Sequence, residues 1–450
     1  MFTKDFVWGT ATASYQIEGA AYEDGRTDSV WDVFSRTEGN VKNFHNGDYA
    51  CDHYHRYKED VKLMAELGVN AYRFSISWSR ILPNGTGEVN QKGIEFYNNL
   101  IDELLKYNIT PYITLFHWDY PHILDRKGGW RNNDSPKWFE EYARVVYNAF
   151  SDRVKNFITF NEPQCFIGGG YQTGVHAPGY KLSRGEIVQM SHNVLKAHGL
   201  AVRALREIAP DCKVGYAPCG SAAIPLTESK EDIEAARKKY FALDPENFNW
   251  CVCWWSDPIM LGHYPEDDPN FKLYSKYLPE NYKEDLELIS TPIDFYCQNI
   301  YSGFLVKAGE SGPEKVPYSI NTSYNSLGWP TTPKSLYWGP KFLYERYKKP
   351  IVITENGMAC HDVVSSDGKV HDPNRIDFIE RYLKELKKCA ADGTDIKGYF
   401  YWSLMDNFEW AHGFTQRFGL VYTDYETFER IPKDSYSYYK EIIAQNGNNL

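Results

Sequence analysis

Residues 351–357 have the sequence Ile-Val-Ile-Thr-Glu-Asn-Gly, and this stretch decides how the rest of the chain is interpreted. The β-branched residues at positions 351–354 predict a buried strand. Asn356 and Gly357 end the strand, because both accept backbone conformations that most residues avoid. The pattern therefore places the Glu355 carboxylate at the carboxyl end of a buried strand, although a single glutamate there could also be a solvated loop residue.

A second stretch has the same design. Residues 155–163 have the sequence Lys-Asn-Phe-Ile-Thr-Phe-Asn-Glu-Pro, in which an apolar strand ends at Glu162 and Pro163 breaks it. Two glutamates at strand ends, far apart in the chain, indicate a carboxylate pair that a closed parallel sheet brings together.

The rest of the chain alternates between strand and helix patterns. Strands are predicted at residues 6–13, 70–78, 110–116, 155–162, 213–217, 292–301, 351–357 and 396–403. Helices are predicted at residues 54–67, 94–107, 138–150, 191–209, 231–240 and 340–348. Eight strand-then-helix units predict an α/β fold, a (β/α)₈ TIM barrel with elaborated loops after the strands. No linker, low-complexity tract or internal repeat divides the chain, so residues 1–450 are predicted to form a single domain.

Composition narrows the class of ligand. The aromatic content of 16% is high, and aromatic rings stack on the apolar faces of sugars as well as on bases. A formal net charge of −11 opposes binding to a phosphate backbone, so no nucleic-acid partner is expected. The ligand expected from these features is a neutral small molecule.

The N-terminal residues, the cysteines and the histidines bear on where the protein is located and on whether it needs a metal or a cofactor. Residues 1–8 contain no uninterrupted apolar segment after a basic start, and no apolar run reaches membrane-spanning length. The nine cysteines lack paired zinc spacing, and Cys251 and Cys253 are too close for the common patterns. The cysteines are interpreted as reduced structural thiols of a cytoplasmic protein without a membrane partner. No metal site is predicted, because the twelve histidines include no His-Glu-x-x-His motif, and no cofactor is expected.

Several polar residues lie near the ends of the predicted strands. Gln16 offers both a donor and an acceptor, which suits a pair of sugar hydroxyls, although an ordinary loop glutamine would have the same pattern. Arg73 lies inside an apolar run and needs a carboxylate, either a strand-end glutamate or a structural partner elsewhere. His117 follows a strand and is predicted to face a polar pocket, with a buried core histidine as the alternative.

Two further features lie later in the chain. Asn299 and Tyr301 fall at the end of the strand predicted at residues 292–301. Residues 307–333 are rich in Gly, Ser, Pro and Tyr and contain Trp329, so this long segment is predicted to be either a functional lid or disordered.

With these residues in place, the sequence resembles the family-1 glycoside hydrolases, the retaining enzymes of β-glucosidase type, over nearly its whole length. The resemblance rests on an ordered set of motifs: residues 6–19, 72–78, 115–119 (Leu-Phe-His-Trp-Asp), 159–163 (Thr-Phe-Asn-Glu-Pro), 353–357 (Ile-Thr-Glu-Asn-Gly), 402–410 and 417–420. A Thr-Glu-Asn-Gly motif alone would be weak, but the whole set is specific.

The resemblance implies roles for these residues. Glu162 would be the acid/base and Glu355 the nucleophile. The residues implied to bind the substrate are Gln16, His117, Trp118, Asn161, Trp329, Trp402, Glu409, Trp410 and Phe418, with Trp402 as a stacking floor and Trp329 on the leaving-group side. Asn299, Arg73 and Tyr301 would tune Glu355, and Asn299 and Tyr301 are also implied to bind the substrate. The implied activity is removal of terminal β-D-glucosyl residues from cellobiose, short cello-oligosaccharides and aryl or alkyl β-glucosides, with a small-molecule β-glycoside as the partner.

Two positions depart from the family pattern. Gln164 follows Asn-Glu-Pro where many members have Trp, which leaves the leaving-group preference open. Ile300 stands between Asn299 and Tyr301 where many members have Tyr, a change of the middle residue only. These motifs do not separate glucose, galactose and fucose as the preferred sugar, nor do they indicate an oligomeric state.

The chemistry requires different protonation states of the two glutamates. Glu355 must be ionised to attack, so Arg73 is expected to lower its pKa. Glu162 must hold a proton at neutral pH, which a less polar setting and a negative Glu355 would favour.

Three other functions would need different residues. A non-catalytic sugar-binding protein would not need both glutamates. A relative that hydrolyses phosphorylated sugars would need a small hydroxyl residue and cations near Glu409. A barrel aldolase would need a lysine at a strand end, and the predicted strand ends offer none.

Overall fold

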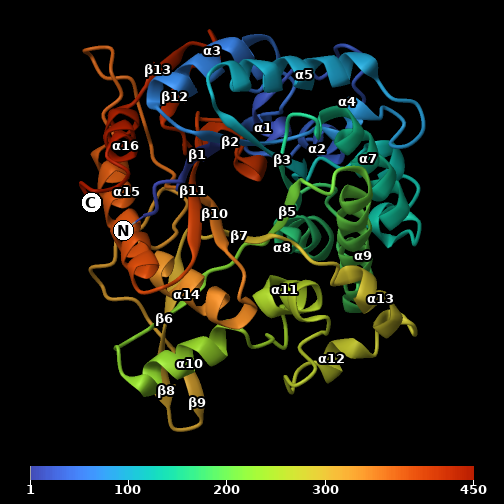
Figure 1. The fold of residues 1–450 in the computed structure, drawn as a ribbon, viewed down its shortest axis with the longest axis vertical. Coiled ribbons are helices and arrows are strands. Elements are labelled where there is room, and N and C mark those ends of the chain that lie inside the picture. Colours follow the sequence, from blue (N-terminus) through green and yellow to red (C-terminus); the bar gives the residue numbers. More distant parts are fainter. Residues whose placement is uncertain (1) are drawn as a thin grey trace.

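A closed barrel of parallel strands forms the centre of the computed structural model, which describes residues 2–450 (Figure 1). Each strand pairs with its neighbours in the order β1-β2-β3-β4-β5-β7-β10-β11, and β11 pairs with β1 to close the barrel. The strands are β1 (Val7–Ala11), β2 (Ala71–Ser75), β3 (Thr110–Phe116), β4 (Asn156–Asn161), β5 (Lys213–Ala217), β7 (Phe295–Asn299), β10 (Ile351–Asn356) and β11 (Ile396–Trp402). Each lies within a predicted range, so the predicted (β/α)₈ barrel is confirmed.

Helices follow the barrel strands and cover them. They include α3 (His53–Leu67), α5 (Gln91–Lys106), α7 (Ser135–Phe150), α9 (Arg184–Ile208), α13 (Tyr282–Ile289), α14 (Ser335–Tyr347), α15 (Pro373–Ala391) and α16 (Asp434–Ala444). Buried side chains occupy one face of these helices, as in α5, where Phe96, Leu100 and Leu104 face the core. Among residues 2–450, the helices lack the combination of length and apolar composition that crossing a membrane requires.

The barrel interior is filled by side chains. Large residues such as Tyr112, Phe295 and Phe400 alternate with small ones across the strands. Gly9 pairs with Phe400, and a Cβ atom on Gly9 would lie only 2.3 Å from the Phe400 ring. The interior is therefore a packed core, and space for a ligand remains only at an end of the barrel.

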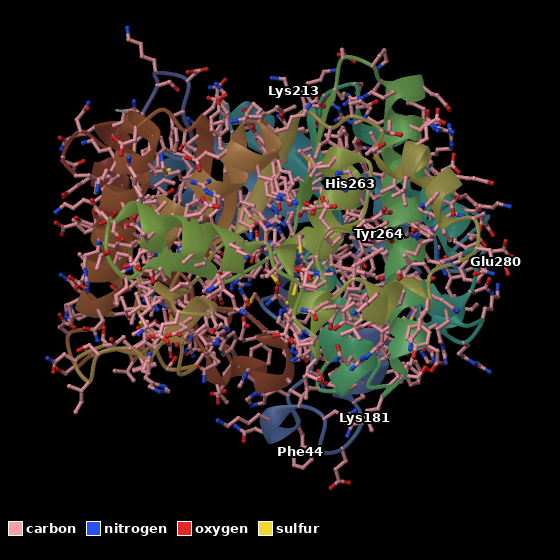
Figure 2. The ribbon with its side chains drawn as sticks, turned by 90° about the horizontal axis from the view of Figure 1, so that it is seen from below. Phe44, Lys181, Lys213, His263, Tyr264 and Glu280 are labelled. Atoms are coloured by element: carbon pink, nitrogen blue, oxygen red, sulfur yellow. The ribbon has the colours of Figure 1, made fainter. Side chains whose placement is uncertain are left out.

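Most large apolar side chains are buried, and most charged side chains are at least partly exposed. Lys213, at the start of β5, and Glu280 are exposed, whereas Tyr264 is fully buried (Figure 2). This distribution is typical of a globular protein in water.

The segment predicted as a lid or disordered region, residues 307–333, is partly regular. β8 (Gly303–Gly309) and β9 (Gly312–Val316) form an antiparallel hairpin, and β8 pairs with β6 (Ala222–Pro225). Helix α10 (Lys230–Tyr240) packs against this small sheet (Figure 1). The prediction of a disordered segment is wrong here, because the hairpin is bonded to β6 and covered by α10.

Helix α14 also differs from its predicted bounds. The sequence predicts that the helix begins at Pro340, but it begins at Ser335 and contains Pro340 in its interior. Leu336 and Tyr337 are buried with the rest of the helix, so packing outweighs the preference of proline for the first turn.

Candidate active site

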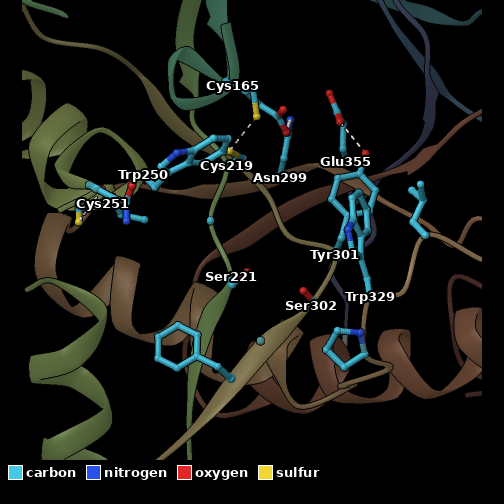
Figure 3. A pocket seen from close by; sticks show the side chains of 18 of the residues that line it. Cys165, Cys219, Ser221, Trp250, Cys251, Asn299, Tyr301, Ser302, Trp329 and Glu355 are labelled. Carbon is cyan, nitrogen blue, oxygen red and sulfur yellow. Dashed lines mark hydrogen bonds between the residues drawn. The ribbon is translucent and has the colours of Figure 1, made fainter. Parts of the chain in front are cut away.

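A cavity of about 820 Å³ lies where the barrel strands end, and Glu355 lines it (Figure 3). Glu162 lines the same cavity. Its size is that of a small-molecule site. The predicted site residues that line it are His117, Trp118, Glu162, Asn299, Tyr301, Trp329, Glu355, Trp402, Glu409, Trp410 and Phe418. Closure of the barrel brings these residues together from distant parts of the sequence.

Glu355 is held by two donors. Arg73, from β2, donates from Nη1 to Glu355 Oε1 at 2.7 Å, and the Tyr301 hydroxyl donates to Oε2 at 2.6 Å. The Arg73 and Glu355 side chains are both almost fully buried. The strand-end partner expected for Arg73 is thus Glu355, and both oxygens of this carboxylate are occupied by hydrogen bonds.

Glu162 has a different environment. It follows β4 with a positive φ of 46°, a conformation that costs energy for a residue other than glycine and is typical of functional sites. Asn299 donates from Nδ2 to Glu162 Oε1 at 2.8 Å. The Thr354 hydroxyl donates to Asn299 Oδ1 at 2.7 Å, which fixes the orientation of the Asn299 amide. No cation bonds directly to Glu162 among the described residues.

Protonation of the two carboxyls follows from these contacts. Burial, and next the charge of Glu355, raise the pKa of Glu162 to about 8. Burial also raises the pKa of Glu355, while Arg73 and the Tyr301 hydroxyl lower it. Arg73 acts in the expected direction, but the net shift of the Glu355 pKa is upward because burial is the larger effect. Since only Glu355 contacts a cation and a hydroxyl donor, it ionises first and leaves the proton on Glu162.

Asn299 contributes to both carboxyls. Its amide nitrogen donates to Glu162 and, at 2.9 Å, to Asn161 Oδ1, and it also lowers the pKa of Glu355. Asn299 therefore acts on Glu162 as well as on Glu355, the carboxyl on which the sequence predicted it would act.

A hydrogen-bond network fixes the protonation of His117. Asn161 Oδ1 accepts from Arg73 and from Asn299, so its amide nitrogen faces His117 and donates to Nε2 at 3.0 Å. Burial, and next Arg73, hold the pKa of His117 well below its usual range, so the ring is neutral. With Nε2 as an acceptor, the ring proton lies on Nδ1.

Three of the predicted site residues carry a buried polar atom that has no hydrogen-bond partner within residues 2–450: Gln16 Oε1, His117 Nδ1 and Glu409 Oε2. Gln16 uses its amide nitrogen for the Phe408 carbonyl at 2.8 Å, which leaves its oxygen free. Burial, and next the charges of Glu355 and Glu162, raise the pKa of Glu409 to about 8. Buried polar groups are normally bonded, so these atoms indicate a ligand that both donates and accepts hydrogen bonds.

Aromatic rings form the walls of the cavity. The rings of Trp118 and Trp410 stack at 4.3 Å, and His117 stacks against Trp402 at 5.6 Å. Both Trp118 and Trp410 have positive φ values, 80° and 48°, which again mark strained backbone at the site. On another side, Trp329 and Phe418 lie near the Tyr301 ring. Apolar walls with a few polar atoms suit a sugar ring.

Three predicted residues do not line the cavity itself. Arg73 and Asn161 lie within the network that holds Glu355 and His117. Gln16 is fully buried beside the chain segment that carries Glu409.

Several residues that line the cavity were not predicted from the sequence: Cys165, His176, Cys219, Trp250, Cys251, Lys315, Tyr318 and His412. Cys165 follows Glu162 by three positions, and this proximity was the only signal available.

The structure also gives a role to Gln164, the residue that departs from the family pattern after Asn-Glu-Pro. Gln164 is buried and bonds to the Cys219 backbone through both its amide nitrogen and its amide oxygen, so it holds the loop after β5 and does not line the cavity.

A carboxyl pair that holds one proton, beside unpaired polar atoms and aromatic walls, can perform nucleophilic and acid/base chemistry on a polyhydroxylated substrate. Among the described residues, these strand ends supply no lysine in contact with either glutamate.

Comparison with known proteins agrees with this geometry. The model of glycosyl hydrolase family 1 matches residues 1–448. Beta-glucosidase A of Thermotoga maritima is 48% identical over 448 residues, which cover 99% of this chain and 98% of the relative. The 1,4-beta-D-glucan glucohydrolase of Thermotoga neapolitana is 47% identical, with 99% of each chain covered.

Solved structures give the same result. The Thermotoga maritima beta-glucosidase in complex with glucoimidazole matches with a TM-score of 0.90 and 47% identity, and 99% of each chain is covered. The same enzyme in complex with deoxynojirimycin matches with a TM-score of 0.90 and 46% identity.

Proposed function

Because this chain belongs to glycosyl hydrolase family 1, we propose that it is a retaining exo-β-glucosidase in which Glu355 is the nucleophile and Glu162 the acid/base. The proposal rests most directly on the contrast between the two carboxyls. Glu355 contacts Arg73 and ionises first, whereas Glu162 has a pKa raised to about 8 and holds a proton at neutral pH. The chain is a hydrolase of β-glucosides, like the relatives it matches at 47–48% identity over their full length.

The reaction follows from these protonation states. Glu355 attacks the anomeric carbon while Glu162 gives its proton to the glycosidic oxygen, so the bond to the leaving group breaks and a glycosyl ester forms on Glu355. Ester formation removes the negative charge that raised the pKa of Glu162. Glu162, now deprotonated, takes a proton from water as the water oxygen attacks the anomeric carbon from the face the leaving group vacated, so the ester bond breaks and Glu355 leaves as a carboxylate. Retaining enzymes of this kind hold the two carboxyls about 5–5.5 Å apart.

The substrate-binding roles are proposed on the same basis. The free atoms of Gln16, His117 and Glu409 accept from or donate to the hydroxyls of the terminal sugar. Trp402 forms a stacking floor, and Trp118, Trp410 and Asn161 complete the sugar site. The remaining residues, Trp329, Phe418 and Tyr301, lie together on another side of the cavity, where the leaving group is proposed to sit.

A neutral sugar is favoured over a phosphorylated one. Burial and two acidic groups, Glu355 and Glu162, raise the pKa of Glu409, and no cation among the described residues acts on it, so a phosphate buried at Glu409 would have no counter-charge there. Burying an unpaired charge is costly.

We also propose a cytoplasmic location. All nine cysteines are free, including the neighbouring pair Cys165 and Cys219, which suits a reducing compartment. The partner is proposed to be a small β-glycoside.

The test is a panel of 4-nitrophenyl glycosides. We expect the highest kcat/KM with the β-D-glucoside, measurable rates with the β-D-galactoside and β-D-fucoside, and no turnover of the α-D-glucoside. Cellobiose should be cleaved faster than cellobiose 6′-phosphate. Turnover of the α-glucoside, or a preference for the phosphorylated sugar, would overturn the proposal.

A further inference from the structure

Glu162 has two thiols beside it that the glycosidase chemistry does not use. One ligand atom from each of Glu162, Cys165 and Cys219 can be chosen so that all three lie within 4.8 Å of one another. Cys165 lies in α8 (Pro163–Ile167), which directly follows Glu162, and Cys219 lies just after β5. Figure 3 shows the two sulfur atoms turned towards each other next to Asn299.

The spacing of the two sulfur atoms matches a tetrahedral metal site. Cys165 Sγ and Cys219 Sγ are 3.7 Å apart. Two thiolates bound to zinc at about 2.3 Å, with a tetrahedral angle between them, lie about 3.8 Å apart. An ion could therefore bind both sulfur atoms with little movement of either side chain.

The three ligands are held by neighbours. Gln164 is fully buried, donates to the Cys219 carbonyl at 2.9 Å and accepts from the Cys219 amide at 3.3 Å. Asn299 donates to Glu162 Oε1 at 2.8 Å. Such orienting bonds are typical of metal sites. All three ligands line the cavity, so water can supply a fourth ligand.

We propose that Glu162, Cys165 and Cys219 form a binding site for a thiophilic divalent cation, with Zn²⁺ as the natural candidate, and that the bound ion switches off glycoside hydrolysis. The sequence predicts no metal site, because these cysteines are 54 residues apart and share no zinc motif. Two sulfur ligands and one oxygen select zinc over magnesium, which prefers six oxygen ligands.

The effect on turnover rests on the proposed function of Glu162, whereas the binding itself does not. Zn²⁺ takes the place of the two thiol protons and of the Glu162 proton, and these protons pass to water. A zinc-bound Glu162 has no proton to give to a leaving group.

The binding test uses Co²⁺ as a spectroscopic substitute for Zn²⁺ on the reduced full-length protein, with excess reductant removed. We expect a thiolate-to-cobalt charge-transfer band that disappears on addition of one equivalent of Zn²⁺ but not of Mg²⁺. Losing a residue that only orients a ligand weakens binding by about 10–100-fold. We therefore expect Cys165→Ser and Cys219→Ser each to weaken Co²⁺ binding by at least about 100-fold.

Cys251→Ser is the matched control. Cys251 also lines the cavity, but it does not belong to the cluster, so this variant should keep the Co²⁺ band. Absence of the band from the wild type, or its survival in both cluster variants, would overturn the proposal.

The turnover test measures 4-nitrophenyl β-glucoside hydrolysis against Zn²⁺ concentration, with each variant compared with its own metal-free rate. Inhibition should be reversed by EDTA and should need at least about 100-fold more Zn²⁺ in either cluster variant, as for Co²⁺ binding. Equal inhibition of all variants would overturn the inhibitory role. A cobalt band without any glycosidase activity would instead show that the proposed function has failed while the metal site stands.

Discussion

At the scale of single residues, the two glutamates differ because their neighbours differ. Both are buried, and burial alone would raise the pKa of each. Of the two glutamates, Arg73 and Tyr301 bond only to Glu355, whereas Asn299 donates to Glu162. One carboxyl pair can therefore supply both a nucleophile and an acid at the same pH.

Tyr301→Phe tests this account of Glu355. The Tyr301 pKa is held well above its usual range by burial, so the hydroxyl keeps its proton and donates to Glu355 Oε2 at 2.6 Å. A hydrogen bond to a charged group is worth about 1.5–3 kcal/mol. Its loss disfavours the ionised form, so the pKa of Glu355 should rise.

The measurement is the pH dependence of kcat/KM. Because Glu355 must be ionised, the acidic limb should move to higher pH in Tyr301→Phe. Because Glu162 must be protonated, the basic limb should stay near pH 8. Tyr318→Phe is the control, since Tyr318 lines the cavity but its hydroxyl bonds to the Gly303 carbonyl. An acidic limb that stays in place in Tyr301→Phe would contradict the account.

At the scale of elements, the end of β10 sets the position of the nucleophile. Asn356 donates to the Ile300 carbonyl at 2.7 Å and accepts from the Tyr399 hydroxyl at 2.9 Å, which ties the end of β10 to the residue after β7 and to the middle of β11. Gly357 follows, and a Cβ atom there would lie 1.8 Å from the Trp402 carbonyl oxygen. The turn therefore needs glycine for a close approach of two strand ends.

Gly357→Ala should accordingly move Glu355 and Trp402 relative to each other. A displacement of about 1 Å can cost about 100-fold in rate, so we expect kcat/KM to fall by at least that factor. Gly368→Ala, in the same loop after β10, is the control for the loss of a glycine: Gly368 has a positive φ of 78°, so alanine there strains the backbone, but the added Cβ atom would meet nothing within 4 Å. Steady-state kinetics and circular dichroism on both variants check the prediction. Full activity of a folded Gly357→Ala protein would show that this close approach is unimportant.

The elements also show what the sequence could and could not predict. The strands that carry Glu162 and Glu355 were predicted because short β-branched or aromatic runs followed by Asn, Gly or Pro are local signals. The hairpin at residues 303–316 was missed, because its pairing with β6 is not local. The bounds of α14 were wrong for a similar reason: burial of Leu336 decides where the helix starts, and burial is not visible in a short window.

In the active site, too, features with a local signal were predicted and features that depend on distant contacts were not. Arg73 was predicted to need a carboxylate because a buried cation must be paired, and its partner is Glu355. The neighbourhood of Cys165 and Cys219 was not predicted, since it depends on how two loops after different strands meet. The hydrogen bond from Gln164 to the Cys219 carbonyl was not predicted either, because it joins the same two loops.

At the scale of the whole molecule, barrel closure brings the functional residues to one place. β1 pairs with both β2 and β11, so the first and last strands of the barrel are neighbours. We propose that residues 1–450 form one domain on this basis, because no part of the barrel closes without the rest.

The shape of the cavity predicts how chains are cut. The packed barrel closes its bottom, while Trp329 and the β9 residue Lys315 lie on its walls. A pocket of this kind admits one chain end, so we expect single glucose units to be released from the non-reducing end of cellopentaose. Chromatography of early products checks this. Cellobiose and cellotriose without glucose would indicate an open groove and internal cleavage.

The central claim is the division of roles between Glu355 and Glu162, and azide tests it most directly. Glu355→Ala cannot form the glycosyl ester, so added azide should attack the anomeric carbon itself and give the α-glucosyl azide by a single inversion. Glu162→Ala should still form the ester with 2,4-dinitrophenyl β-glucoside, because this leaving group needs no proton. Its activity on cellobiose should fall much further, since acid/base help is worth about 10²–10⁴-fold. Azide should then attack the ester and give the β-glucosyl azide by a double inversion.

The measurement is the coupling constant of the anomeric proton in the NMR spectrum of each azide product. The account predicts the small coupling of an α-azide from Glu355→Ala and the large coupling of a β-azide from Glu162→Ala. A β-azide from Glu355→Ala together with an α-azide from Glu162→Ala would mean that the two roles are reversed.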